Sequence, residues 1–312
     1  TETIYDIASL TKVVSTVPVS MKLIAQKKIF LDQKIHQFYP QFIGEKKESV
    51  TIRHLLTHSS GLEDYIPFYQ FKHIQNKEDV LHHILDSKLE FEPGSRSKYS
   101  DLGFILLSFI IEKVSDRSID RLAKSWIFRP FGMNYTQYSP PAEWIKNIAP
   151  TELDTLYRQR LIQGEVHDEN THLMGGVSGH AGVFSTAEDI AKYAQLWVDG
   201  GLLKGKRFFR EYQIKAFTAK QNLPEESDFA LGWDTPSQKG KSIAGDYFTL
   251  GSIGHLGFTG TSLWIDPNQK IIIVLLSNRV HPSRKGNNGS REMYGIRREF
   301  HNAVMAKLIM EK

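Results

Sequence analysis

The sequence contains no cysteine among its 312 residues. This absence excludes disulfide bonds, thiolate metal sites and a cysteine nucleophile, although it leaves the cellular compartment open. The longest apolar stretches, such as residues 104–111, are far shorter than a membrane span. The net charge is only +4, and Lys and Arg are scattered in ones and twos, without the basic stripe typical of nucleic-acid binding. The sequence therefore predicts a globular protein with no transmembrane segment and no nucleic-acid partner.

Several catalytic and cofactor motifs are also missing. There is no Walker loop and no G-x-G-x-x-G, and the G-x-S-x-G elbow fails at Ser178 because His180 stands where the second Gly is required. His54 and His58 have the spacing of a helical zinc pair, but Leu55 replaces the Glu of H-E-x-x-H. We interpret this pair as helix packing and capping, and we expect neither a metal nor an organic cofactor.

The order of the predicted elements indicates the fold class. Apolar residues at helical spacing predict a buried helix opening at Ser9, with a kink at Pro18. Further helices are predicted over 51–56, over 101–114 with Asp101 near its N-cap, after a capping box at 185–188, and over 299–310. Strands are predicted over 247–253, 261–265 and 271–276, separated by turn residues. This order predicts an α+β fold in which helices flank one antiparallel sheet.

The first candidate for chemistry is the S-x-x-K motif formed by Ser9 and Lys12. Side chains three residues apart lie on one face of a helix, so the hydroxyl and the amine are within reach of each other. A serine hydroxyl is a weak nucleophile until a neighbour takes its proton, and a partly desolvated lysine can do so. A serine at a helix N-terminus also has a backbone N–H beside the developing oxyanion.

A second match to the same motif, Ser95 with Lys98, serves as an internal control. It follows Pro93 and Gly94 in a predicted loop, and no apolar helix begins at Ser95. Only Ser9 stands where the chemistry requires a nucleophile.

Two later motifs are weaker when taken singly. Tyr99 and Asp101 precede the apolar helix, where a phenol can transfer protons and a carboxylate can hold a substrate amide. The alternative is a packing tyrosine followed by an ordinary N-cap. The stretch 254–261 has glycines that let a substrate lie along a strand, with His255 as a titratable group. Its alternative is a hairpin with a surface histidine.

Together these motifs resemble the family of class C β-lactamases, penicillin-binding proteins and related esterases. The order S-x-x-K, then Tyr-Ser-Asn or its Asp variant, then Lys- or His-x-Gly on a late strand is the family's order. The similarity covers nearly the whole chain, through the segments 7–12, 51–62, 93–94 with 99–101, 179–186 and 257–267.

The resemblance implies a set of roles for individual residues. Ser9 would attack an amide or ester carbonyl, Lys12 would take its proton, and Tyr99 would protonate the leaving group. The oxyanion would lie between the backbone N–H groups of Ser9 and Phe258. His255 would orient Tyr99 or meet a substrate carboxylate. Asp101 would hold a substrate amide, with Gly257 beside it in the binding site.

The resemblance also implies the domain organisation. We expect a single β-lactamase/DD-peptidase-like domain over 1–312, with an α/β lobe formed by about 1–30 and 240–312 and a helical lobe over about 31–239. Family members carry a helix and two strands before the nucleophile, so we expect this chain to lack that N-terminal segment.

Two further features set expectations about the substrate. His255 stands where β-lactamases have Lys, and this loss of a fixed charge disfavours β-lactam carboxylate binding. The segment 164–170 resembles a subgroup joined or adjacent to cell-wall glycosidases, and its acidic and His residues either line the cleft or form a structural loop.

The resemblance implies a serine hydrolase that forms an acyl-enzyme, acting on D-amino-acid peptides or esters of the bacterial cell wall, or on β-lactams. The expected location is outside the cytoplasm, with a signal sequence not present in this chain. Expected partners are a small-molecule or peptide substrate, the chain's own missing N-terminal segment, and cell-wall glycosidases. The alternative is a non-catalytic ligand-binding or scaffolding module on the same fold.

Overall fold

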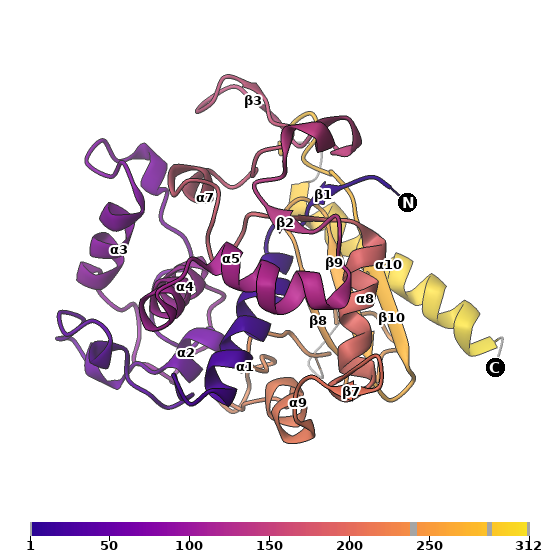
Figure 1. Cartoon of the computed structure of the whole chain (residues 1–312), viewed down its shortest axis with the longest axis horizontal. Helices are drawn as coiled ribbons and strands as arrows, with labels where there is room; N and C mark the ends of the chain where they lie inside the picture. The colour runs from indigo at the N-terminus through magenta and orange to yellow at the C-terminus, as the bar shows by residue number, and fades with distance from the viewer. Residues whose placement is uncertain (1, 238–241, 286–288, 311–312) are drawn as a thin grey trace.

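The computed structural model describes residues 2–237, 242–285 and 289–310. The fold is the predicted α+β mixture of helices and antiparallel strands (Figure 1), but the strands of the described residues form two three-stranded and two two-stranded sheets, where one sheet was expected. The helices are α1 Val17–Ala25, α2 Ile52–Leu56, α3 Lys77–Asp86, α4 Asp101–Ser115, α5 Ile119–Ala123, α6 Arg129–Phe131, α7 Glu169–Leu173, α8 Ala187–Val198, α9 Glu211–Thr218 and α10 Gly289–Met310. The strands are β1 Tyr5–Asp6, β2 Gln137–Tyr138, β3 Leu153–Asp154, β4 Arg160–Leu161, β5 Val183–Ser185, β6 Leu202–Leu203, β7 Lys206–Arg207, β8 Ile253–Leu256, β9 Ser262–Asp266 and β10 Ile271–Leu275.

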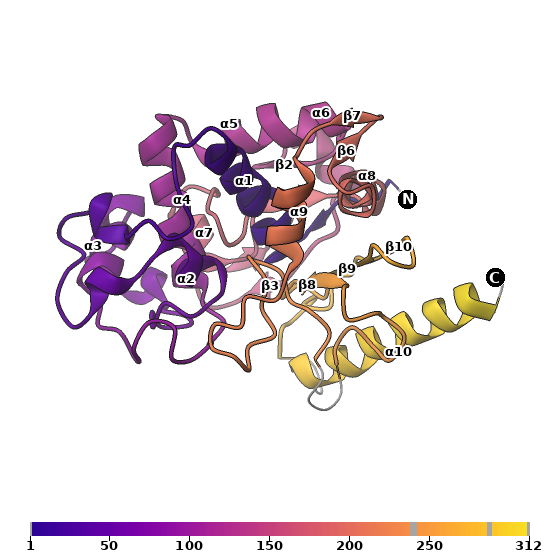
Figure 2. The ribbon, with the colours of Figure 1, turned by 90° about the horizontal axis from the view of Figure 1, so that it is seen from below.

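The late strands form an antiparallel meander in the order β10-β9-β8. Figure 2 shows this sheet between α8 on one side and α10 on the other. Side chains alternate across a strand, so Leu263 and Ile265 of β9 join the main core, whereas Trp264 joins a second cluster that includes Met305 of α10. Gly254 of β8 lies opposite Trp264, where a Cβ would overlap the indole ring.

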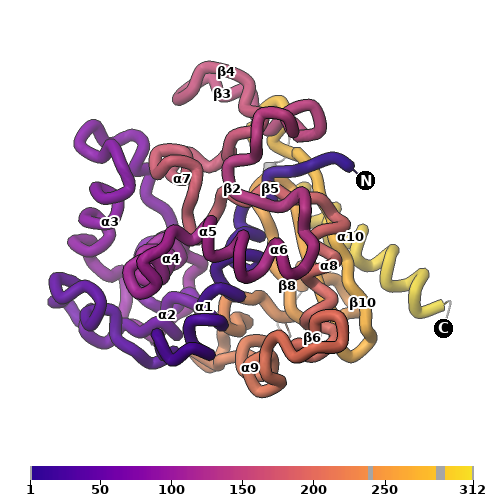
Figure 3. The backbone as a smooth tube through the Cα atoms, viewed as in Figure 1, coloured from indigo at the N-terminus to yellow at the C-terminus, as the bar shows by residue number. Residues whose placement is uncertain are grey.

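Helix α8 packs on β9 and β10. The expected helical lobe covered about residues 31–239 and therefore included α8. In the structure, α8 instead lies against the late sheet. A second small sheet, β1-β5-β2, joins the start of the chain to residues from its middle. The β3–β4 hairpin projects from the body, and both ends of the chain lie on the same side of the molecule (Figure 3).

The helix that carries the S-x-x-K motif is irregular at its start. A π-helical turn over Lys12–Thr16 precedes α1, and Pro18 occupies one of the first two positions of α1. The wider turn accommodates the proline, which has no N–H to donate. This irregular turn lies directly before the position at which the sequence predicts a kink.

Several predicted boundaries were wrong, each at an end of an element. The strand predicted over 247–253 begins only at Ile253, because Asp266 accepts hydrogen bonds from the Thr249 N–H and hydroxyl at 2.9 and 3.0 Å and holds the chain in a turn. The cap of α8 is Thr186 with the Asp189 N–H, one residue later than predicted. The terminal helix α10 begins ten residues before the predicted 299.

Candidate active site

A cavity of about 620 Å³ joins the nucleophile segment, the start of α4, the segment before α7 and the turn after β8. Its lining includes all the predicted site residues except the buried Lys12: Ser9, Tyr99, Asp101, His255, Gly257 and Phe258. It also includes residues that the sequence did not single out: Tyr65, Tyr69, His180, Arg279, Arg284, Tyr294 and Arg297.

Ser9 lies at the first turn of the helix that leads into α1. The N–H of Lys12 donates to the Ser9 carbonyl at 3.0 Å, so the motif forms a helical turn as predicted. The Lys12 ammonium donates to Ser9 Oγ at 3.2 Å, and the Lys12 side chain is fully buried. Ala8 has a φ of 46°, a conformation that costs energy for a residue with a Cβ. The chain therefore turns sharply where it delivers Ser9 to the cavity.

The strongest partner of Lys12 is Asp101, whose Oδ1 lies 2.6 Å from Nζ. The His180 carbonyl accepts a further hydrogen bond from Nζ at 3.3 Å. Although burial lowers it, the pKa of Lys12 is raised overall because Asp101 and Tyr99 favour the charged form. The raised pKa makes the resting side chain an ammonium ion, which must lose a proton before Lys12 can act as the base that the resemblance implies.

Tyr99 stands directly before the cap of α4. The cap is Ser100, with Asp101 next to it as predicted, and the Ser100 Oγ accepts from the Gly103 N–H at 3.2 Å. The Lys12 Nζ lies 4.7 Å from the centre of the Tyr99 ring. Burial raises the pKa of Tyr99, and the Lys12 ammonium opposes that rise. The phenol is thus protonated at neutral pH and can act as a proton donor.

His255 lies on β8 itself, with its ring centre 5.8 Å from that of Tyr99. Its Nδ1 pairs with the Leu256 carbonyl at 2.7 Å, so Nδ1 carries the proton, and its buried Nε2 has no partner within the described residues. Burial and the nearby Lys12 lower the pKa of His255 to about 3. A neutral ring with a free Nε2 can accept a hydrogen bond, but at so low a pKa it neither takes up a proton near neutral pH nor attracts a carboxylate.

The turn after β8 is tied to the segment before Ser9. Thr261 Oγ1 donates to the Ile7 carbonyl at 3.2 Å, and Thr259 Oγ1 donates to the Asp6 carbonyl at 2.7 Å. A Cβ on Gly257 would overlap Thr261 Oγ1 and stand 2.6 Å from the Ile7 carbonyl oxygen, so this position requires glycine.

The two main-chain N–H groups expected to hold the oxyanion are those of Ser9 and Phe258. In residues 2–237, 242–285 and 289–310, neither group donates to another residue. Both are therefore free to bind a substrate oxygen.

Asp168 and His180 form a pair next to Lys12: His180 is buried, and Asp168 lines the cavity and belongs to the segment 164–170 whose acidic and His residues were expected either to line the cleft or to form a structural loop. His180 Nε2 lies 3.0 Å from Asp168 Oδ1, and its Nδ1 lies 2.8 Å from Ser178 Oγ. Although burial raises it, the pKa of Asp168 is lowered overall because His180 and Thr171 stabilise the carboxylate. The pair holds the main chain at His180, and the His180 carbonyl accepts a hydrogen bond from Lys12 Nζ. His180 belongs to the 179–186 segment, which the sequence marked only by its resemblance to the family.

Two arginines at the other wall were also missed. Arg297, on α10, is buried and donates to the carbonyls of Gly257 and Thr261 at 2.6 and 2.9 Å. Arg279 donates through Nε to the Phe258 carbonyl at 2.7 Å. Neither guanidinium has a carboxylate partner in the part of the chain that the structure describes. Burial lowers the pKa of Arg297 to about 10, so it remains charged at neutral pH.

The His54 and His58 pair has the packing and capping roles expected. His54 Nδ1 accepts from the Thr51 N–H at 3.1 Å in the cap of α2. His58 Nδ1 accepts from the Ser100 N–H at 3.0 Å, and its ring lies 4.6 Å from that of Tyr99. His58 therefore packs against the Tyr99 ring and holds the main chain at Ser100.

Comparisons with known proteins agree with this geometry. The family model described as Beta-lactamase matches residues 1–293. A protein of Escherichia coli (strain K12) named "Putative D-alanyl-D-alanine carboxypeptidase" is 35% identical over 309 residues, which cover 90% of this chain and 70% of that protein.

Two solved structures share the fold at lower identity. The hydrolase "EstCE1", with promiscuous acyltransferase activity, has a TM-score of 0.71 and 22% identity over 97% of this chain and 85% of its own. A penicillin-binding protein homologue from Caulobacter crescentus has a TM-score of 0.69 and 18% identity over 89% of this chain and 78% of its own.

Proposed function

The chain belongs to the beta-lactamase family and is a serine hydrolase, and on this basis we propose that it is a carboxypeptidase of D-amino-acid peptides. The observation that carries the proposal is the pair of guanidinium groups without a carboxylate partner, Arg279 and Arg297, in the same cavity as Ser9 among the described residues. A carboxypeptidase must recognise the free carboxylate next to the scissile bond. The neutral His255 does not supply that charge, and the two arginines do.

In the proposed acylation, Ser9 Oγ attacks the carbonyl carbon while its proton passes to Lys12 Nζ. The backbone N–H groups of Ser9 and Phe258 bind the oxyanion. The C–N bond then breaks, and the Tyr99 hydroxyl gives its proton to the leaving amine. The neutral His255 ring, whose centre lies 5.8 Å from that of the Tyr99 ring, holds the Tyr99 side chain in place by packing.

In the proposed deacylation, water attacks the ester on Ser9 and gives a proton to the Tyr99 phenolate. Lys12 returns its proton to Ser9 Oγ, which restores every group to its starting state. Asp101 is partly exposed to the cavity, so it remains our candidate for accepting a substrate N–H beside the reacting carbonyl.

Lys12 must be a neutral amine to accept the Ser9 proton. Because Asp101 favours the ammonium form, we expect only a fraction of molecules to hold the active form at neutral pH. The rate should therefore rise towards alkaline pH.

The name of the Escherichia coli relative supports a D-alanyl-D-alanine substrate. Such substrates belong to the bacterial cell wall, so we propose a location outside the cytoplasm. Among the described residues, no helix is long and apolar enough to cross a membrane. Ser9 and Tyr99 line one cavity, and the buried Lys12 lies 3.2 Å from Ser9 Oγ and 4.7 Å from the centre of the Tyr99 ring; this arrangement argues against the non-catalytic alternative.

The test compares an acyl-D-alanyl-D-alanine peptide with its C-terminal amide, measuring release of the terminal residue by mass spectrometry. We expect kcat/KM for the free acid to exceed that for the amide by about tenfold or more. Arg279→Gln should lower the ratio of kcat/KM for the free acid to kcat/KM for the amide. Arg160→Gln, in the projecting β4 strand, should leave this ratio unchanged. Equal rates on acid and amide, or turnover of neutral esters alone, would reject the carboxypeptidase assignment while keeping the hydrolase.

A further inference from the structure

The proposed oxyanion site is assembled from two segments that are far apart in the sequence. Ser9 comes from the start of the chain and Phe258 from the turn after β8, so something must fix their separation. Building on the proposed function, we infer that Asp6 and His167 are positioning residues that brace these two segments against each other.

Asp6 contacts all three segments that meet at this point. Its Oδ1 accepts from the Ala8 N–H at 2.8 Å, within the strained turn that presents Ser9. Its Oδ2 accepts from the His167 N–H at 2.7 Å, and its main-chain carbonyl accepts from Thr259 Oγ1 at 2.7 Å. Asp6 is buried, so water does not replace these contacts. One residue therefore links the Ser9 turn, the Phe258 turn and His167.

His167 completes the brace through its ring. The ring stacks on that of Phe258, with centres 5.7 Å apart and planes inclined by 26°. Phe258 is otherwise open to the cavity, with 47% of its surface exposed. The Arg279 guanidinium lies 4.6 Å from the Phe258 ring centre and supplies a further contact. The side chain of Phe258 is thus held in place, and its own N–H is held with it.

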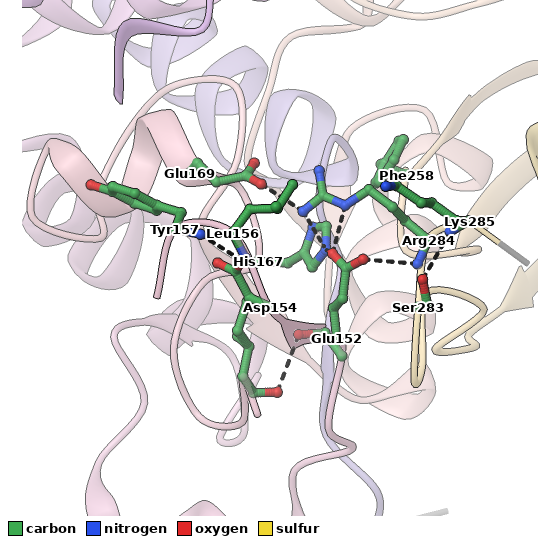
Figure 4. Close-up of polar contacts among 12 residues, drawn as sticks. Glu152, Asp154, Leu156, Tyr157, His167, Glu169, Phe258, Ser283, Arg284 and Lys285 are labelled. Carbon is green, nitrogen blue, oxygen red and sulfur yellow. Dashed lines mark hydrogen bonds and ion pairs between the residues drawn. The ribbon is translucent and has the colours of Figure 1, made fainter. Parts of the chain in front are cut away.

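The His167 ring is itself fixed by a charged network (Figure 4). Its Nε2 lies 2.9 Å from Glu152 Oε2. Arg284 donates to Glu152 from its backbone N–H at 2.8 Å and from Nε at 2.5 Å, and its NH2 group donates to Glu169 Oε1 at 2.6 Å. Although burial raises it, the pKa of Glu152 falls to about 2 because His167 and Arg284 donate to the carboxylate.

The network gives the segment 164–170 a function beyond forming a loop. It closes the wall of the cavity and carries the ring that supports Phe258. Glu152 orients the ring, and Arg284 joins Glu152 to Glu169 at the start of α7. None of these groups lies within hydrogen-bond distance of Ser9 Oγ in the described part of the chain, so their effect on the reaction is through the position of the Phe258 N–H.

The experiment compares His167→Ala with His167→Phe, using p-nitrophenyl acetate as a simple ester. Both variants keep the main-chain bond to Asp6, and only Phe keeps a ring against Phe258. We expect kcat for His167→Ala to fall by about tenfold to a hundredfold with KM unchanged, and His167→Phe to recover most of that loss. Arg160→Gln is the control, because its ion pair with Glu165 lies in the same segment without reaching Phe258.

A second readout separates positioning from general loss of structure. Phenylboronic acid bonds through boron to Ser9 Oγ, and the tetrahedral adduct places an oxygen in the oxyanion site. Its affinity should fall in proportion to kcat in His167→Ala, whereas the melting temperatures of the variants should not follow the order of their kcat values. Asp6→Ala should lower kcat and boronate affinity in the same ratio.

The outcomes are distinct from failure of the proposed function. If Ser9→Ala keeps full ester hydrolysis, the assignment of the nucleophile fails. If Ser9→Ala is inactive but His167→Ala keeps wild-type kcat, the brace is rejected. It is also rejected if His167→Phe is as slow as His167→Ala, or if KM and kcat change without any loss of boronate affinity.

Discussion

The chain contains the same four-residue motif twice, in two environments that differ in almost every respect. Lys12 is fully buried and donates to Ser9 Oγ at 3.2 Å. Lys98 has 38% of its side chain exposed, and the Ser95 hydroxyl donates to the carbonyl of Glu92 at 2.7 Å. In the first pair Ser9 lines a cavity and Lys12 is buried behind it, whereas the second pair faces solvent. The motif therefore fixes only the distance between serine and lysine along the chain. The burial and the neighbouring groups of the two side chains determine whether the serine is reactive.

The charges around the two lysines sharpen the contrast. Lys98 pairs with Glu90 at 2.8 Å and with Asp64 at 3.1 Å in an exposed cluster, where ion pairs contribute little. Lys12 pairs with the carboxylate of Asp101 in a buried site where each charge strongly affects its neighbours. A carboxylate partner therefore contributes little stability beside the exposed Lys98, whereas beside the buried Lys12 it raises the pKa of the amine against the effect of burial.

The largest difference is expected when each lysine is replaced by methionine, which keeps length but not charge. Lys12→Met should lower kcat/KM by about a thousandfold, because the Ser9 proton loses its acceptor. Lys98→Met should change kcat/KM by less than about twofold. Ester hydrolysis measures both, with circular dichroism confirming that each variant is folded. Comparable losses in the two variants would contradict the contrast between the sites.

A second comparison concerns two glycines. Gly257→Ala should lower kcat by about a hundredfold, because its Cβ would clash with Thr261 Oγ1 and the Ile7 carbonyl and move the Phe258 N–H. Gly295→Ala, in α10 with no atom within 4 Å of its Cβ, should keep full activity and gain about 0.5–1 kcal/mol of stability. Steady-state kinetics and thermal unfolding test the pair. A fully active Gly257→Ala would show that the turn does not control the oxyanion site, and a slow Gly295→Ala would contradict the free space around that position.

A third comparison removes a carboxylate beside each lysine. Asp101→Asn takes away the charge that raises the pKa of Lys12, while burial continues to lower it. The base then loses its proton at lower pH, so the acidic limb of kcat/KM should move to lower pH. If the limb moves by about one pH unit, the rate at a fixed pH on that limb rises about tenfold. Asp64→Asn, beside Lys98, should leave the profile unchanged. A limb that moves to higher pH in Asp101→Asn would exclude Lys12 as the base.

The smallest expected effect is an absence of titration at His255. Its pKa is lowered to about 3 by burial and by Lys12, so the ring stays neutral across about pH 5 to 8. The pH profile of kcat/KM should therefore contain no inflection caused by His255 near the ordinary histidine pKa. The profiles of the wild type and of His255→Gln should have the same inflections in that pH range. NMR of the ring protons gives a direct check, and a chemical-shift change centred near neutral pH would contradict the assigned state.

The sequence was sufficient for features that depend on local spacing. Ser9 and Lys12 lie within one turn, and Tyr99 directly precedes the cap of α4, so their neighbours in the chain carry the signal. The α+β fold followed from helical periodicity and three late strands, and the family comparisons confirm it. The exact start of β8 was not predictable, because it depends on the side chain of Asp266.

The missed residues act over long separations in the chain. Arg297 and Gly257 are brought together by the packing of α10 on the late sheet. Asp6 reaches His167 and Thr259 through a fold that joins the start, middle and end of the sequence. No periodicity or local motif marks such residues, since their function depends on the tertiary structure alone.

Of the two serines that lie three residues before a lysine, we propose that Ser9 is the activated nucleophile and that Ser95 is not. Intact-mass spectrometry after treatment with a fluorophosphonate, applied to the wild type, Ser9→Ala and Ser95→Ala, tests it most directly. We predict a single adduct on the wild type and on Ser95→Ala, and none on Ser9→Ala. An adduct that persists on Ser9→Ala, or one that is lost in Ser95→Ala, would contradict the assignment of Ser9 as the nucleophile.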